Sequence, residues 1–161
     1  MGKISAAKSA GYCLIFGPII ALICFFLQPG GVLGIGGSPE ALDFAQGMNI
    51  LVENSELGII TAFLITIGLI SLLSGQMYYI QSMQDGNGFG IGRVAIPFFF
   101  VAVFGWVIAN AIAISTASEV LNSTDMLALS SAINTTSLFS FGVGGLFLAL
   151  AASTRDEINK N

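Results

Sequence analysis

The side chains that most often carry catalysis and metal binding are scarce in this sequence. It contains no histidine and only two cysteines, Cys13 and Cys24. Histidine is the most versatile general base and metal ligand, and a zinc site needs several nitrogen or sulfur ligands close together. The two cysteines are about 16 Å apart along a helix, too far to share a metal or form a disulfide. We therefore expect no resident metal, no other cofactor and no Ser-His-Asp or Cys-His catalytic centre.

Two carboxylates could form an acid–base pair. Glu53 and Glu56 lie one helical turn apart, just before a long apolar segment. General acid–base chemistry needs two such groups with different proton affinities facing one reacting bond. Acidic residues at the entrance of an apolar segment are more often solvated, and no other carboxylate pair stands out. The sequence therefore favours a protein that is not an enzyme.

The polar side chains inside the apolar segments are all neutral. Proton relays and ion-coupled transport sites usually depend on ionisable residues at membrane depth, so their absence weighs against a pump. Asn110 is the most notable polar residue, and Thr66, Ser137 and Ser140 are expected at a similar depth. Our hypothesis is that Asn110 forms a hydrogen bond to one of these hydroxyls across a helix interface. The alternative is that the four side chains line a path for a neutral solute.

Small residues at four-residue spacing predict close contacts between helices. Such rows let two backbones approach, which increases dispersion contact where hydrophobicity cannot drive association. Three rows meet this description: Gly105, Ala109 and Ala113; Gly145, Ala149 and Ser153; and the shorter pair Ser71 and Gly75.

One short motif suggests a covalent modification. Asn122, Ser123 and Thr124 form an N-glycosylation sequon between two apolar segments. Such sequons arise by chance and act only in a secretory compartment, so Asn122 is a candidate acceptor and no more.

These residues must be positioned by helices that cross a membrane. Charged residues make up 9% of the chain and hydrophobic residues 55%, whereas soluble proteins are about one quarter charged. A crossing helix needs about 20 predominantly apolar residues. Four runs without Asp, Glu, Lys or Arg are longer than this, and we place spans at about 11–27, 57–80, 94–118 and 132–152. The predicted fold is an all-α, up-down bundle of four transmembrane helices in a single domain.

The positive charges predict the orientation of this bundle. Lysine and arginine are retained in cytoplasmic segments. Lys3 and Lys8 precede the first span, Arg93 lies in the segment 81–93, and Arg155 and Lys160 follow the fourth span. The segments 28–56 and 119–131 contain no positive residue. We expect both termini and the loop 81–93 in the cytoplasm, with 28–56 and 119–131 as outer loops.

The first outer loop contains the pattern of a short amphipathic helix. Ser38 can cap it, Pro39 suits its first turn, and Glu40 and Asp43 complement the positive end of its dipole. We expect this helix to lie on the outer interface or to cap the bundle.

Three functions remain compatible with these observations. The first is an accessory or structural subunit of a larger complex in the plasma membrane, with other integral membrane subunits or further copies as partners. The second is a small oligomeric channel for neutral solutes, and the third is an enzyme that acts on lipids. Nucleic acid is not expected as a partner, because five positive residues in the whole chain form no basic patch.

Overall fold

All regular structure in the described part of the chain is helical. The computed structural model describes residues 5–40 and 42–154. Five helices follow one another in the chain: α1 (Ala6–Leu27), α2 (Phe44–Glu53), α3 (Ser55–Gln81), α4 (Phe89–Ala117) and α5 (Thr124–Ser153).

Four of the helices are long and apolar enough to cross a membrane. α1, α3, α4 and α5 contain 22, 27, 29 and 30 residues, which corresponds to about 33–45 Å of helix. They coincide with the four predicted spans but extend beyond them, most clearly at α5, which begins at Thr124 rather than near residue 132. The difference arises because hydropathy marks the apolar part of a helix, whereas hydrogen bonding continues through its polar first turns.

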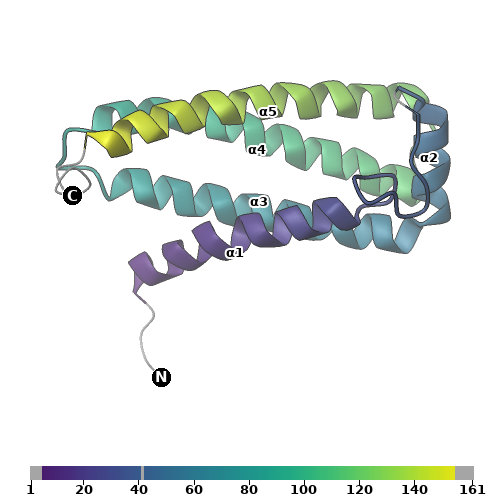
Figure 1. Cartoon of the computed structure of the whole chain (residues 1–161), viewed down its shortest axis with the longest axis horizontal. Helices are drawn as coiled ribbons and strands as arrows, with labels where there is room; N and C mark the ends of the chain where they lie inside the picture. The colour runs from purple at the N-terminus through teal and green to yellow at the C-terminus, as the bar shows by residue number, and fades with distance from the viewer. Residues whose placement is uncertain (1–4, 41, 155–161) are drawn as a thin grey trace.

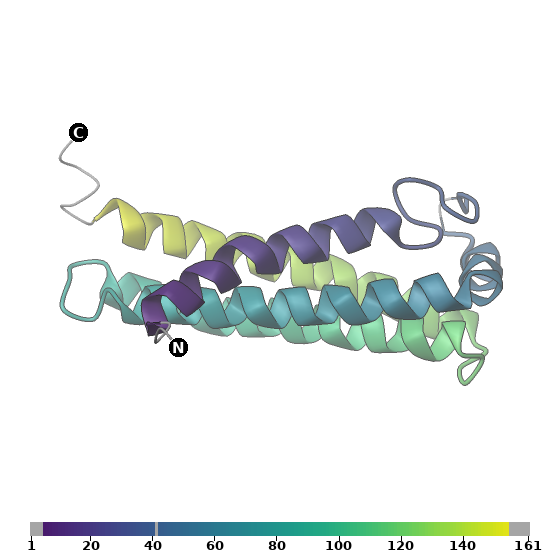
Figure 2. The same ribbon diagram turned by 90° about the horizontal axis from the view of Figure 1, so that it is seen from below.

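The four long helices form an open layer rather than a closed ring (Figures 1 and 2). Extensive packing joins α1 to α3, α3 to α4, and α4 to α5. Each helix runs antiparallel to its neighbour, and α1 begins at the end of the layer where α5 finishes (Figure 1). Among the described residues α1 and α5 share no comparable contact. They are therefore the two edges of the layer, and the sequence-based prediction of a bundle is refined to this open form.

The apolar core lies mainly between the two central helices. Ile65, Leu69 and Leu73 of α3 meet Phe99 and Val103 of α4, and all five side chains are buried. Most other large apolar side chains are exposed, which is the arrangement expected where lipid is the solvent.

The edge helix α1 meets α3 at a crossing built on two glycines. A Cβ atom added at Gly17 would lie 2.7 Å from the carbonyl oxygen of Gly68, and one added at Gly68 would lie 2.6 Å from that of Gly17. About two turns further along α3, a Cβ at Gly75 would lie 2.7 Å from Cγ of Leu14. The two backbones are in direct contact, so the crossing requires glycine on both helices.

The short helix α2 lies across one end of α3, α4 and α5 (Figure 1). It therefore covers this end of the layer. The helix begins at Phe44, so the prediction that Ser38 is its N-terminal cap was wrong. The cap is Asp43, whose Oδ1 accepts a hydrogen bond of 2.9 Å from the backbone N–H of Gln46. Gln46 in turn accepts from the backbone N–H of Glu40, so the two side chains together fix the start of the helix.

Candidate functional site

Two of the four polar residues singled out within the apolar segments bond to their own helices. Nδ2 of Asn110 donates to the carbonyl oxygen of Trp106 at 2.8 Å. Oγ1 of Thr66 donates to the carbonyl oxygen of Ala62 at 3.0 Å. The expected hydrogen bond from Asn110 to a hydroxyl of another helix is replaced by these local bonds, because the carbonyl four residues earlier is always within reach.

The polar contacts between helices are made by α5 instead. Oγ of Ser130 donates to the carbonyl oxygen of Ala109 on α4, at 3.4 Å. Ser137 is 2% exposed and lies against Gly105, where a Cβ atom would collide with its hydroxyl group. Ser140 is half-buried. Ser137 thus belongs to the α4–α5 interface rather than to an open path.

Two of the three predicted small-residue rows lie at helix contacts. Ala109 and Ala113 are buried on α4, with Gly105 against Ser137 of α5. Ser71 and Gly75 lie on the side of α3 that meets α1, because a Cβ at Gly17 would approach that of Ser71 to 3.2 Å.

The third row lies mostly on a surface that the described helices do not cover. Gly145 has no neighbouring atom within 4 Å of an added Cβ, and Ala149 and Ser153 are exposed. The residues of α5 that pack on α4 are one heptad apart: Ser130, Ser137, Gly144 and Ala151, all of them buried. The predicted row is therefore not the face of α5 that packs on α4. The packing face is rotated from the predicted row by about one residue position around the helix.

Two buried polar atoms escaped the sequence analysis. Oε1 of Gln76 on α3 and Oγ1 of Thr116 on α4 are enclosed and have no hydrogen-bond partner among the described residues. Gln76 is 6% exposed and lies on the buried side of α3, five residues before the end of the helix. The only sequence signal was an amide inside an apolar segment, and a buried amide without a partner costs about 1–3 kcal/mol.

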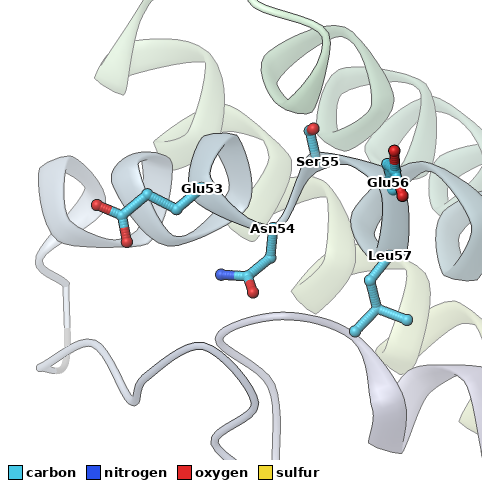
Figure 3. A pocket seen from close by; sticks show the side chains of 5 residues that line it. All are labelled: Glu53, Asn54, Ser55, Glu56 and Leu57. Carbon is cyan, nitrogen blue, oxygen red and sulfur yellow. The ribbon is translucent and has the colours of Figure 1, made fainter.

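A shallow depression lies where α2 meets α3 (Figure 3). It has a volume of about 420 Å³ and is lined by Glu53, Asn54, Ser55, Glu56 and Leu57. The carboxylates of Glu53 and Glu56 point away from each other (Figure 3). They do not face a common point, so the geometry gives no support to an acid–base pair here.

Metal-binding and redox groups do not gather elsewhere in the described residues. Within that part of the chain no three His, Cys, Asp or Glu side chains are placed to hold an ion. Cys13 and Cys24 are both free thiols.

The remaining predicted residues lie at the two ends of the layer. Asn122 is exposed in the loop between α4 and α5, so its sequon is sterically accessible. Lys8 and Arg93 lie near the opposite end, and Arg93 stacks over the ring of Phe89, 5.7 Å from its centroid. Lys3, Arg155 and Lys160 lie outside the described residues.

Comparison with known proteins identifies no relative of this chain. No protein-family model, no characterised protein and no solved structure matches this chain.

Proposed function

We propose that this protein is a non-catalytic accessory subunit of a larger complex of integral membrane proteins. The open layer is the observation that carries the proposal. α1 packs chiefly on α3, and α5 packs on α4 and the end of α2. Both edge helices therefore have most of their surface available for other transmembrane helices, and little of the chain lies outside the spans.

The proposed topology has four crossings of the plasma membrane, with both termini of the chain in the cytoplasm. Lys8 and Arg93 support it, since they lie at the end of the layer opposite α2. At the end that carries α2, every charged residue of the segments 28–56 and 119–131 is acidic: Glu40, Asp43, Glu53, Glu56, Glu119 and Asp125. This asymmetry is the one expected when positive residues are retained inside.

The local chemistry favours this function over the two others. Asn110 and Thr66 each donate a hydrogen bond to a carbonyl oxygen of their own helix, which leaves fewer polar groups for a solute path. Glu53 and Glu56 diverge, so this pair gives no support to lipid chemistry (Figure 3).

The test is extraction of the tagged chain from its native membrane in mild detergent, at its natural level of expression. The proposal predicts other integral membrane proteins in fixed stoichiometry with the chain after two different purification steps. A homogeneous particle that contains only this chain would overturn the proposal, and flux into liposomes would then be the next property to measure.

A further inference from the structure

The loop between α3 and α4 contains two glycines that each follow a residue with a side-chain carbonyl group. The sequence there is Asp85, Gly86, Asn87 and Gly88, and the side chains of Asp85 and Asn87 are both exposed. Asparagine is among the thermolabile residues, because the backbone nitrogen of the next residue can attack its side-chain carbonyl carbon. A following glycine favours this attack, since it has no Cβ atom beside the nitrogen and adopts a wide range of backbone angles.

The two glycine nitrogens of this loop differ in their hydrogen bonding. The N–H of Gly86 donates to the carbonyl oxygen of Met83 at 2.8 Å, which closes a turn. The N–H of Gly88 makes no hydrogen bond to any described residue, as is usual for a backbone donor at the start of a helix. A nitrogen that donates to a carbonyl oxygen must lose that bond before it can turn toward another group. The nitrogen that follows Asn87 is therefore free to react, whereas the nitrogen that follows Asp85 is not.

We propose that Asn87 undergoes spontaneous deamidation in the folded protein, with water as the co-reactant. The backbone nitrogen of Gly88 gives up its proton and forms a bond to Cγ of Asn87. The bond from Cγ to Nδ2 breaks, and the amide nitrogen leaves with this proton as ammonia. Water then opens the five-membered ring at one of its two carbonyl carbons. Breaking the new bond gives aspartate at position 87, and breaking the original peptide bond gives an isoaspartyl linkage through the side chain.

The two products differ in their effect on the start of α4. Aspartate adds a negative charge next to the positive end of the helix dipole, which is a favourable place for it. The isoaspartyl linkage lengthens the main chain by one methylene group directly before Gly88. Gly88 is buried and so close to α5 that an added Cβ atom would collide with the carbonyl oxygen of Ala151. The isoaspartyl form therefore loosens the contact between α4 and α5, whereas the aspartyl form retains it.

This inference is independent of the accessory-subunit proposal, because it concerns one exposed loop and requires no partner. The test uses the full chain, purified in mild detergent and incubated in neutral buffer. Peptide mass spectrometry follows the replacement of the side-chain NH₂ group by OH. The matched control is Asp85→Asn, which creates the same asparagine–glycine pair at position 85 of the same loop. The two pairs differ in whether the glycine N–H already donates to a carbonyl oxygen.

In the folded Asp85→Asn protein, position 87 is expected to deamidate about twofold to tenfold faster than position 85, which is the factor that one backbone hydrogen bond contributes. In the same protein unfolded by denaturant, the two positions should react at similar rates, because water then reaches both nitrogens. Asn87→Gln should remove the reaction at position 87, since its longer side chain cannot form the five-membered ring. The isoaspartyl fraction should unfold at a lower denaturant concentration than the unreacted protein, whereas Asn87→Asp should unfold at the same concentration.

Three results would overturn the inference. The first is an unreacted position 87 in the folded protein under conditions in which the unfolded chain is deamidated. The second is reaction at position 85 of the folded Asp85→Asn protein that is as fast as at position 87, or faster. The third is an isoaspartyl form as stable as the unreacted protein, which would refute the proposed effect on α4.

Discussion

The crossing of α1 and α3 gives the sharpest prediction about the fold. Gly17→Ala adds a Cβ atom 2.7 Å from the carbonyl oxygen of Gly68 and 2.9 Å from the backbone nitrogen of Leu72. Both neighbours are backbone atoms, so they cannot rotate away, and the two helices must separate. α1 packs chiefly on α3 and buries only Ala10, Gly17, Ala21 and Cys24. The separation therefore weakens almost every contact that holds α1 in place.

The magnitude follows from the cost of overpacking. Forcing extra atoms into a packed contact costs about 1–3 kcal/mol, while Gly→Ala in a helix returns about 0.5–1 kcal/mol through backbone entropy. We expect Gly17→Ala to lower the free energy of unfolding by about 1–2 kcal/mol. Gly11→Ala is the matched control on the same helix, because its added Cβ would meet nothing within 4 Å.

The assay is reversible unfolding in mild detergent, by titration with a denaturing detergent and by heating. The reasoning predicts a destabilised Gly17→Ala protein beside a Gly11→Ala protein that is unchanged or slightly more stable. Equal stability of the two variants would refute the close crossing and, with it, the position of α1 against α3.

Three further changes probe other parts of the structure. Gln76→Leu should leave the free energy of unfolding unchanged or raise it by about 1 kcal/mol, since it removes a buried oxygen without a partner among the described residues. A clear decrease in the same unfolding titration would mean that another group forms a hydrogen bond with this amide. Asp43→Ala removes the N-terminal cap of α2 and should cost about 1 kcal/mol of local stability. The measurement is amide hydrogen exchange over Phe44–Glu53, which should become faster. Unchanged exchange would show that another group caps the helix. Asn122→Cys should react with a membrane-impermeant thiol reagent added outside intact cells, whereas Asp85→Cys should react only after permeabilisation; the reverse pattern would invert the proposed topology.

The sequence predicted the four long helices well because hydropathy and charge indicate directly whether a segment is surrounded by lipid or by water. The four charge-free runs found all four long helices, with the largest error at the polar start of α5. The start of α2 was misplaced because both Ser38 and Asp43 can cap a helix. Asp43 is the cap because its side chain accepts from the backbone N–H of Gln46, while the side chain of Gln46 accepts from the backbone N–H of Glu40. These two hydrogen bonds together fix the start of α2 at Phe44.

The neighbours of each helix could not be predicted in the same way. Lipid and helix interiors are both apolar, so composition does not say which face of α5 packs on α4. Spacing favoured Gly145 and Ala149, whereas Gly144 and Ala151 make the contact. The glycine crossing of Gly17 and Gly68 was missed, although Gly17 and Ala21 are small residues four positions apart on α1, as in the rows that the sequence analysis used. The unsatisfied oxygen of Gln76 became visible only once its surroundings were known.

The central claim is that other transmembrane subunits cover the edges of this open layer. The most direct measurement is a single-particle electron microscopy map of the particle extracted from its native membrane. The account predicts transmembrane helices of other proteins packed along α1, α5 or both. A particle in which both edges meet only lipid, detergent or further copies of this chain would contradict it.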